Sequence, residues 1–217
     1  MIYTIKKFKH DLDLVRDSSP SFSLPLHIEL WLKDYLIKKS PLDAGFPWIN
    51  YCVIQFLHSF IHPNMNVLEF GAGGSSIFFL KRDVNLITIE HEEIWINNVR
   101  KRISSSQKDR WTAKHISQSL PNHTIPFVND YLTPLDHLKN DSIDIAFIDG
   151  RHRLESIKRS IPLIKNGGAI ILDNSDRPQY SDAFGLLESW SLQNTSCITN
   201  GSEFFTPAAI WTKPSFA

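Results

Sequence analysis

Hydrophobic and polar positions follow two periodicities along this chain, and the changes from one to the other mark its predicted elements. Short apolar runs bounded by turn residues are typical of buried strands, whereas apolar positions that recur about every three or four residues are typical of amphipathic helices. On this basis strands are predicted, in chain order, at residues 66–70, 85–90, about 112–117, 143–149, 169–173, 196–199 and 208–212.

Helices are predicted between these strands and also before the first of them. One precedes Pro41 and covers residues 28–36, and a second covers residues 49–60 and stops before Pro63, because proline cannot continue a helix. Since both precede the first strand, we interpret residues 1–62 as a helical cap that belongs to the same domain as residues 63–217. Further helices are expected near residues 77–80, 94–103, 135–139, 154–161 and 182–191, with a turn at 166–168.

The alternation of strand and helix from residue 66 onward predicts a Rossmann-like, doubly wound α/β fold with a mostly parallel sheet of seven strands. The last two strands are joined by a non-helical link, residues 200–207. A link of this length is too short for a parallel crossover, so these two strands must pair antiparallel. The sheet should therefore contain one reversed strand near the C-terminus.

The composition of the chain argues against several classes of protein, but it does not identify a function. The 217 residues suffice for one α/β domain, and Lys+Arg and Asp+Glu both number 23. A neutral balance argues against a nucleic-acid binder, which would carry a basic excess. Two cysteines are too few for a disulfide framework, no apolar run approaches the length of a membrane span, and the N-terminus carries charges where a signal peptide needs apolar residues. A cytoplasmic protein without a membrane or nucleic-acid partner is expected.

The sequence NVLEFGAGGSS, residues 66–76, predicts a ligand site. It describes a buried strand, a turn rich in glycine and the start of a helix, which is the unit that cradles nucleotides at the carboxyl end of a strand in doubly wound folds. Gly71, Gly73 and Gly74 lack a Cβ, so a ligand can lie against the backbone. Ser76 stands where the third glycine of a dinucleotide fingerprint belongs, which lowers the expectation of an NAD enzyme. A purely structural turn is the alternative.

Glu90 ends the second predicted strand and is followed by His91. An acid at this point faces the crevice and can accept hydrogen bonds from both hydroxyls of a ribose, and the histidine could flank the adenine edge. The alternative is an acid that is favoured simply by the dipole of the following helix. The glycine turn at the appropriate distance favours the ribose interpretation.

The segments LEFGAGGSS and ITIEHE together resemble the first two motifs of class I S-adenosylmethionine-dependent methyltransferases. Glu69, Gly71, Gly73 and Glu90 fall on the motif positions, and the resemblance covers about residues 66–212. This cofactor has no phosphates, so its loop needs close approach of the backbone rather than a Lys or Arg clamp. The resemblance implies that S-adenosylmethionine is bound by Glu69, Gly71, Ala72, Gly73, Gly74, Ser75, Glu90, His91 and Asp149.

Asp149 ends the fourth predicted strand, and Asp173 and Asn174 end the fifth. Adjacent parallel strands end side by side, so these three side chains should converge next to the glycine turn. Two carboxylates about 4 Å apart repel by roughly 4 kcal/mol at an effective dielectric constant of about 20, so a proton, a cation or distance must offset the repulsion. Oxygen ligands of this kind suit a hard divalent cation such as Mg²⁺.

The same arrangement is similar to the metal site of catechol-type O-methyltransferases, and the IDG-x-H segment is similar to that of macrocin-type O-methyltransferases. The chain departs from the latter by Asn174, where a second acid is usual. The resemblance implies that His152 is the general base that removes the proton from the substrate hydroxyl; a polar residue in the first turn of the next helix is the alternative. Arg151 and Arg153 are expected to be solvated arginines on the surface, with binding of an anionic substrate group as the alternative.

Two aromatic residues, Trp48 and Tyr51, begin the helix before the first strand. We interpret them as core residues, with closure over the cofactor as the alternative. The resemblance implies that related enzymes pair through their N-terminal helices, so a homodimer is compatible with the apolar face at Trp31 and Tyr35.

Taken together, the residues and the resemblance predict a methyltransferase that acts on a hydroxyl of a small molecule with the help of a divalent cation. An NAD-dependent oxidoreductase is one alternative, and it must explain the missing third glycine. A scaffold that binds the cofactor without catalysis is another, although such a scaffold would have no use for an acid cluster. A third keeps the methyltransferase but relies on His152 without a metal.

Overall fold

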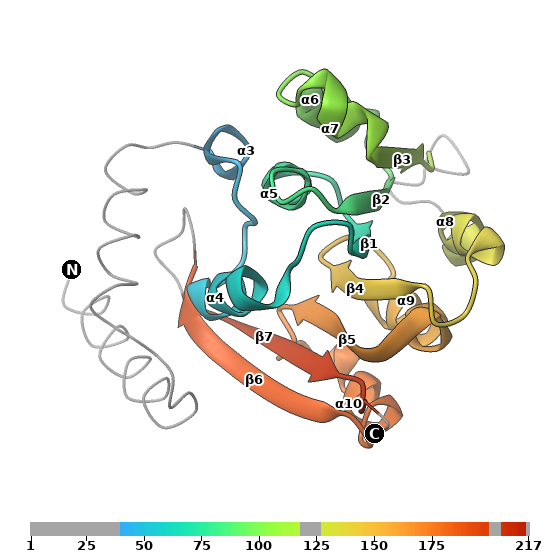
Figure 1. Ribbon diagram of the computed structural model, residues 1–217. Coiled ribbons are helices and arrows are strands. Elements are labelled where there is room, and N and C mark those ends of the chain that lie inside the picture. Colours follow the sequence, from blue (N-terminus) through green and yellow to red (C-terminus); the bar gives the residue numbers. More distant parts are fainter. Residues whose placement is uncertain (1–39, 118–126, 200–204, 216–217) are drawn as a thin grey trace.

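The computed structural model describes residues 40–117, 127–199 and 205–215, and they form one α/β fold (Figure 1). A seven-stranded sheet has the order β3-β2-β1-β4-β5-β7-β6, which confirms the predicted fold class. The first strand of the chain thus lies near the centre of the sheet, and the strand order reverses beside it. The strands are β1 (Asn66–Phe70), β2 (Asn85–Glu90), β3 (Trp111–His115), β4 (Ile143–Ile148), β5 (Ile164–Asp173), β6 (Ser191–Ile198) and β7 (Phe205–Thr212).

The reversed strand predicted from the short link is β7. Strands β1 to β5 pair parallel with one another, whereas β7 pairs antiparallel with both β5 and β6. Strand β7 therefore lies inside the sheet, between β5 and the edge strand β6, rather than at the edge itself. The carboxyl ends of β1, β2, β4 and β5 all lie at one edge of the sheet, which is the edge that carries the predicted site.

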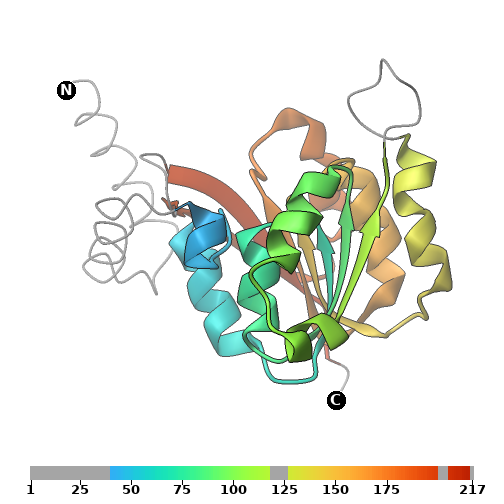
Figure 2. The same cartoon turned by 90° about the horizontal axis from the view of Figure 1, so that it is seen from above.

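Helices cover both faces of the sheet (Figures 1 and 2). Alternate residues of each central strand face opposite layers, since Val67 belongs to the core under α4 and α5 while Leu68 belongs to the core under α8 and α9. The helices are α3 (Pro41–Ala44), α4 (Tyr51–Phe60), α5 (Gly74–Leu80), α6 (Glu93–Arg100), α7 (Ser105–Asp109), α8 (Val128–Leu132), α9 (Arg153–Ser160) and α10 (Asp182–Leu186), with 3₁₀ turns at Thr133–His137, Ile161–Leu163 and Pro178–Tyr180.

The helix predicted over residues 49–60 is α4, and it is joined to the C-terminal strands. The Asn50 side chain accepts the Val53 N–H at its oxygen (3.1 Å) and donates to Thr195 Oγ1 (3.0 Å) and the Thr206 carbonyl (2.7 Å). One buried asparagine thus begins the helix and attaches it to β6 and β7. The helix predicted over residues 28–36 lies outside the described residues, and the domain boundary at residue 62 stays a prediction.

Several boundaries differ from the prediction for local reasons. Strand β5 begins at Ile164 and includes the segment predicted as a turn, because the Gly167 N–H donates to the Lys213 carbonyl and the Lys213 N–H donates to the Gly168 carbonyl. Helix α6 ends at Arg100 and is followed by the separate helix α7, while Trp95 at its start is partly exposed. Within the described part of the chain, no helix is long and apolar enough to cross a membrane.

Candidate active site

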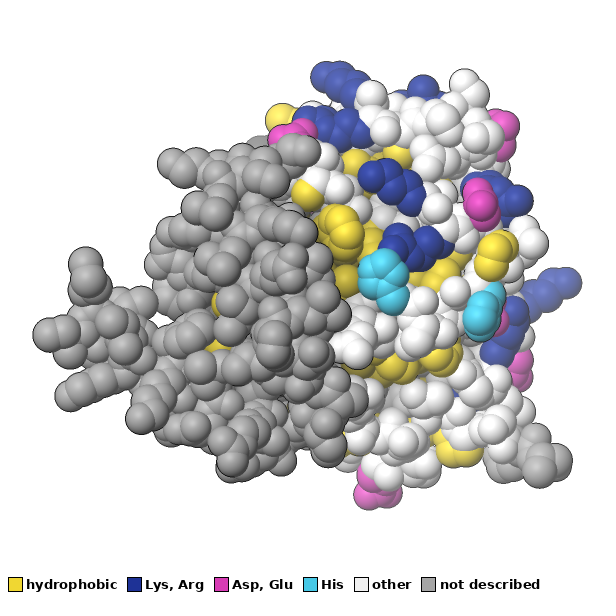
Figure 3. All heavy atoms as spheres, turned by 60° about the vertical axis from the view of Figure 1, so that its left-hand side comes forward, with side chains coloured by type: hydrophobic (Ala, Val, Ile, Leu, Met, Phe, Trp, Pro, Cys, Tyr) yellow, Lys and Arg dark blue, Asp and Glu magenta, His cyan; other side chains and the backbone are white. Residues whose placement is uncertain are grey.

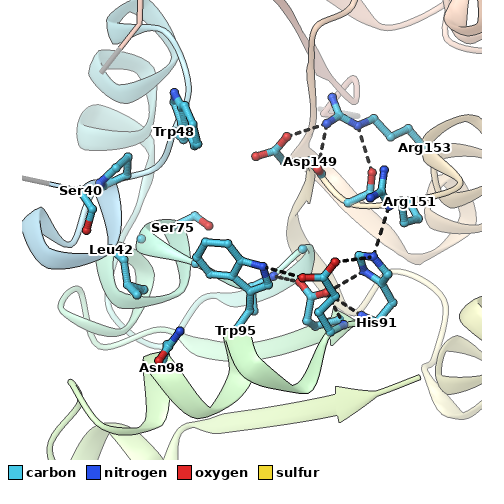
Figure 4. A pocket seen from close by; sticks show the side chains of 18 residues that line it. Ser40, Leu42, Trp48, Ser75, His91, Trp95, Asn98, Asp149, Arg151 and Arg153 are labelled. Atoms are coloured by element: carbon cyan, nitrogen blue, oxygen red, sulfur yellow. Dashed lines mark hydrogen bonds and ion pairs between the residues drawn. The ribbon is translucent and has the colours of Figure 1, made fainter. Parts of the chain in front are cut away.

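A cavity of about 630 Å³ opens at the carboxyl ends of β1, β2 and β4. Its size lies within the usual range for small-molecule sites, roughly 300–1,000 Å³. On the face seen in Figure 3, basic and histidine side chains gather beside hydrophobic ones. The lining residues are Ser40, Pro41, Leu42, Trp48, Gly71, Ala72, Gly73, Gly74, Ser75, Glu90, His91, Glu92, Trp95, Asn98, Asp149, Gly150, Arg151 and Arg153 (Figure 4).

The glycine turn forms one wall of this cavity. Gly71 has a φ of 97°, a value that side chains rarely adopt, and a Cβ there would come within 3.2 Å of the Gly150 backbone. A Cβ on Gly74 would lie 2.1 Å from the Phe46 carbonyl oxygen. At Gly73, by contrast, a Cβ would meet no atom within 4 Å. Two of the glycines are therefore needed for packing, whereas Gly73 leaves open the space that a ligand needs to approach the backbone.

Glu90 lines the cavity with its carboxylate already oriented by the turn. One of its oxygens accepts the Ala72 N–H at 2.7 Å, and the other accepts the N–H groups of His91 (2.6 Å) and Glu92 (2.8 Å). The oxygen that accepts the Ala72 N–H keeps a second lone pair, so it can still accept a hydrogen bond from a hydroxyl. The backbone bonds fix the acid at the rim of the cavity, where the sequence predicted it.

His91 connects this acid to Arg151. Its Nδ1 lies 2.7 Å from a Glu90 oxygen, and its Nε2 accepts a hydrogen bond from Arg151 Nε at 3.3 Å. The imidazole therefore bridges the Glu90 carboxylate and the Arg151 side chain. Arg151 also lines the cavity, and within the described residues no ion pair joins it to a carboxylate.

Glu69 lies beneath the turn and does not line the cavity. One of its oxygens accepts the hydroxyls of Ser76 (2.6 Å) and Thr88 (2.7 Å), which ties β1 to α5 and β2. Its other oxygen is buried without a hydrogen-bond partner. Burial raises the pKa of Glu69 to about 7, against the lowering effect of the hydroxyl bonds. The other residues predicted to bind the cofactor do line the cavity.

Asp149, Asp173 and Asn174 converge at the ends of β4 and β5, and Arg153 lies among them. Its Nη2 donates to Asp149 Oδ1 at 2.7 Å, and its Nη1 lies 3.4 Å from Asp173 Oδ2 and 3.5 Å from Asn174 Oδ1. Burial, together with the neighbouring Asp173 carboxylate, raises the pKa of Asp149 well above its usual value, and burial also raises the pKa of Asp173. The Arg153 charge acts against both shifts.

The prediction that Arg153 is a solvated surface residue is wrong. The residue is only 8% exposed, since the backbone at His152 has a φ of 49° and begins α9 with Arg153 turned back towards the strand ends. The signal was present in the sequence. A pair of neighbouring acids needed a proton, a cation or distance to offset their repulsion, and an arginine follows Asp149 by one helical turn.

The three predicted metal ligands therefore already surround a cation of the protein itself. Asp149 reaches the cavity with a side chain that is 30% exposed, whereas Asp173 and Asn174 lie behind the guanidinium and do not line the cavity. Among the described residues, no group of three or more His, Cys, Asp or Glu side chains is placed to hold a metal ion. In this arrangement the side chains do not fit an additional Mg²⁺, because the guanidinium contacts all three of them.

His152 lies beside the cavity rather than in its lining. Its ring packs against Tyr131 with the ring centroids 5.6 Å apart. Tyr131 is fully buried, donates its hydroxyl to the Ile89 carbonyl (3.3 Å) and accepts the Arg151 N–H (3.4 Å). This tyrosine supports the turn at Gly150, and nothing in the sequence connected residue 131 to the site.

Two tryptophans on opposite sides of the cavity complete it (Figure 4). Trp48 is 59% exposed and lines the cavity, so its interpretation as a core residue is wrong, whereas Tyr51 is buried as predicted. Trp95 donates its indole N–H to Glu92 at 3.1 Å. The helix start at Ser40, Pro41 and Leu42 adds a further wall that the sequence did not signal.

Comparisons with known proteins show a family match and a shared fold. Residues 68–175, about half of the chain, match a family model described as a methyltransferase domain. No curated protein sequence matches the chain.

Solved methyltransferases share the fold at low sequence identity. A methyltransferase from Geobacter sulfurreducens superposes with a TM-score of 0.54 at 14% identity, covering 75% of this chain and 77% of that one. Precorrin-6Y C5,15-methyltransferase from Geobacter metallireducens gives 0.52 at 15% identity, over 74% and 86% of the two chains. A putative caffeoyl-CoA O-methyltransferase from Staphylococcus aureus gives 0.51 at 17% identity, over 94% and 98%.

The family match begins within β1 and ends just after β5, so it contains the glycine turn, Glu90 and the acids of the cavity. The likeness to the solved structures concerns the fold that brings these residues together. On this combination of family match, sheet order and site, the chain belongs to the class I S-adenosylmethionine-dependent methyltransferases.

Proposed function

We propose that this methyltransferase acts on a hydroxyl group of a small molecule. The observation that carries the proposal is the position of Asp149, whose carboxylate opens into the same cavity that the glycine turn and Glu90 line. An acceptor bound there would meet an acidic side chain beside the methyl donor. When bound, S-adenosylmethionine supplies an electrophilic methyl group, and the residues of the chain must hold it and prepare the acceptor.

The residues that would hold the cofactor fit it in chemistry. Gly73 leaves its side of the turn open, so the backbone can be approached closely. Glu90 presents a fixed carboxylate with one oxygen that can still accept a hydrogen bond, which suits a hydroxyl of a ribose. Trp95 and the exposed Trp48 offer flat apolar surfaces on either side, which suit an aromatic base or an aromatic acceptor.

Asp149 is the first candidate for the base that removes the proton from the acceptor hydroxyl. A hydroxyl is a poor nucleophile until it loses its proton, and a positioned base typically contributes about 10²- to 10⁴-fold to the rate. Asp149 is the acid at the end of β4 that faces the cavity, and its bond to Arg153 orients it (2.7 Å). His152, the base implied by the family resemblance, stays a candidate for a relay behind it, since it lies outside the lining.

The cavity volume also limits the acceptor. A space of about 630 Å³ must hold both cofactor and acceptor, which favours a small sugar, phenol or other hydroxylated metabolite. The balanced charge of the chain gives no support to a nucleic-acid acceptor. The divalent cation is left out of the proposal because Arg153 already lies among its predicted ligands. A homodimer formed through the N-terminal helices stays a prediction.

Isothermal calorimetry with S-adenosylhomocysteine tests the cofactor site first. We expect one molecule to bind per chain, and the absence of binding at about millimolar ligand would contradict the cofactor assignment.

Methyl transfer is then tested with methyl-labelled S-adenosylmethionine and a panel of hydroxylated small molecules. Each compound is paired with its analogue lacking the hydroxyl, and the labelled carbon is located in the product by NMR. Label on oxygen supports the proposal. Label on carbon, or equal labelling of the analogues, would contradict hydroxyl methylation while leaving the methyltransferase assignment intact.

A further inference from the structure

In the described part of the chain, every hydrogen-bond acceptor of the Arg153 guanidinium is an oxygen atom. Besides the three side-chain oxygens of the acid cluster, it donates from Nε to the Gly150 carbonyl (3.1 Å) and from Nη2 to the Asp149 carbonyl (2.8 Å). Its Nη1 also donates to the Asp173 carbonyl. Two carboxylates, one amide and three backbone carbonyls are the donor set that a hard divalent cation takes in proteins.

We propose that Arg153 permanently takes the place of a divalent cation in this site. The inference rests on the proposed function in one respect only, namely that the site works on a hydroxyl; the occupancy of the acid cluster is a separate question. Arg153 acts as a positioning residue, since it lies behind Asp149 and holds that carboxylate towards the cavity.

Local structure keeps the guanidinium in position. Arg153 is the first residue of α9, and Asp149 and Gly150 precede it by about one turn. The guanidinium is therefore held by the same segment whose Asp149 charge it balances. The Tyr180 ring lies near its other face, 5.9 Å from the guanidinium carbon. Any displacement would leave three backbone carbonyls, the buried Asp173 carboxylate and the partly buried Asp149 carboxylate without their donor, which is a costly state. A metal ion would therefore have to displace the arginine or bind next to its positive charge.

This arrangement changes the class of acceptor that the site can recognise. A metal ion bound by a catechol or another vicinal diol uses two adjacent oxygen atoms of the substrate as ligands. A guanidinium whose N–H groups are already used by the protein offers no open coordination position. We therefore expect an acceptor with a single reactive hydroxyl to be methylated as efficiently as an acceptor with two adjacent hydroxyls.

The full chain with Mn²⁺ as the probe tests the occupancy, with free Mn²⁺ measured by electron paramagnetic resonance. We expect the wild type to bind none up to about 1 mM, the weak limit for protein sites of this kind. Arg153→Met should gain one site, because the acids lose their internal cation, and the double variant Arg153→Met/Asp173→Asn should lose it again. Arg159→Met is the matched control. Arg159 lies on the same helix but pairs with Asp136 at the surface, so this variant should gain nothing.

Two outcomes would overturn the proposal. One is binding of Mn²⁺ by the wild type that Asp173→Asn abolishes, since the acids would then hold a metal beside the arginine. The other is a folded Arg153→Met variant that binds no Mn²⁺, since the oxygen set would then not be a cation site. If Arg153→Met does not fold, as judged by circular dichroism, the wild-type titration with its Asp173→Asn control still decides. The labelling experiment with hydroxylated acceptors decides the proposed function without Mn²⁺, so a failure of hydroxyl methylation is distinguishable from a failure of this inference.

Discussion

Three neighbouring glycines of the turn after β1 have three different surroundings, and at the scale of single residues only two of them are required by packing. A Cβ on Gly74 would clash with backbone carbonyls, and one on Gly71 would crowd the Gly150 backbone at a positive φ. Gly73 is in an extended conformation with open space on its side-chain face. A methyl group at position 73 is therefore compatible with the fold, and the ligand is what it would obstruct.

Gly73→Ala should lower the affinity for S-adenosylhomocysteine by about 10-fold or more, because one misplaced group in a close contact costs at least about 1.4 kcal/mol. Its thermal midpoint should stay near that of the wild type. Gly74→Ala should instead destabilise the fold by about 1–3 kcal/mol through overpacking. Gly185→Ala, in the open helix α10, is the matched control and should weaken neither property. Equal affinity for S-adenosylhomocysteine in Gly73→Ala and the wild type would contradict the hypothesis that the glycine turn contacts the cofactor.

The rate of methyl transfer in variants of Asp149 and His152 shows which of the two residues is the general base. Asp149→Asn should lower kcat by about 10²-fold or more, because it removes the base that faces the cavity while keeping the shape of the side chain. His152→Ala should have a smaller effect, since the ring lies outside the lining. Single-turnover assays with a substrate from the labelled panel measure both, and the reverse order of effects would return the role of base to His152.

At the scale of secondary-structure elements, Glu69 holds three of them together beneath the cavity. It belongs to β1 and accepts hydroxyl donors from α5 and β2. Its pKa, raised by burial from 4.5 to about 7, means that the folded state binds this proton more tightly than the unfolded chain. The stabilisation is therefore fully present below about pH 4.5 and is lost as the pH rises through about 7.

Glu69→Gln should flatten the pH dependence of stability. The shift corresponds to on the order of 3 kcal/mol across this window, and a neutral glutamine can keep the acceptor oxygen for Ser76 and Thr88 without titrating. Urea unfolding at about pH 5 and about pH 8 measures the difference in each protein. Glu155→Gln, at the exposed surface of α9, should retain the wild-type dependence. A Glu69→Gln variant with the same dependence as the wild type would show that Glu69 does not titrate in this range.

The end of β2 illustrates how a strand and the following turn build one acceptor. Glu90 is held by three backbone N–H groups from two turns. We expect Glu90→Gln to weaken S-adenosylhomocysteine by about 10- to 100-fold, since hydrogen bonds to a charged group contribute about 1.5–3 kcal/mol. The neighbouring exposed Glu93→Gln should bind as the wild type does. Calorimetry on both variants measures the affinity for S-adenosylhomocysteine. Unchanged affinity in Glu90→Gln would contradict the hypothesis that Glu90 binds the ribose.

At the scale of the whole molecule, the cavity lies between parts of the chain that are far apart in sequence. Residues near position 41, the glycine turn, α6 and the end of β4 all line it. A ligand that contacts all of them must stabilise the folded state as a unit, because the unfolded chain has no such cavity.

Saturating S-adenosylhomocysteine should therefore raise the thermal midpoint of the wild type. At about 100 times its dissociation constant the gain is about 2.7 kcal/mol, or roughly 5–10 °C for a chain of this size. Differential scanning fluorimetry measures the shift. Adenosine-free homocysteine at the same concentration should give a much smaller one, and equal shifts with both ligands would contradict a site built around Glu90 and the turn.

Much of the fold was predictable because local pattern and chain connectivity determine it. The central strands β1, β2 and β4 were found within one residue, since buried parallel strands carry continuous apolar runs. The reversed strand followed from the short link before β7. The lengths of α6 and α10 were less predictable, because tertiary contacts decide where an amphipathic helix ends.

The sequence by itself predicted which residues meet in one cavity: the turn from Gly71 to Ser75, Glu90 and Asp149 all line it, because strand ends of a parallel sheet must meet. Only the tertiary structure decided what balances the acids. The Arg153 side chain could turn outwards or back towards β5. Its direction depends on the backbone at His152 and on the carbonyl groups that accept hydrogen bonds from the guanidinium. The sequence supplied a candidate cation four residues after Asp149, but only the fold shows that its guanidinium lies among the acids. The role of Tyr131 and the exposure of Trp48 likewise became clear only from the fold.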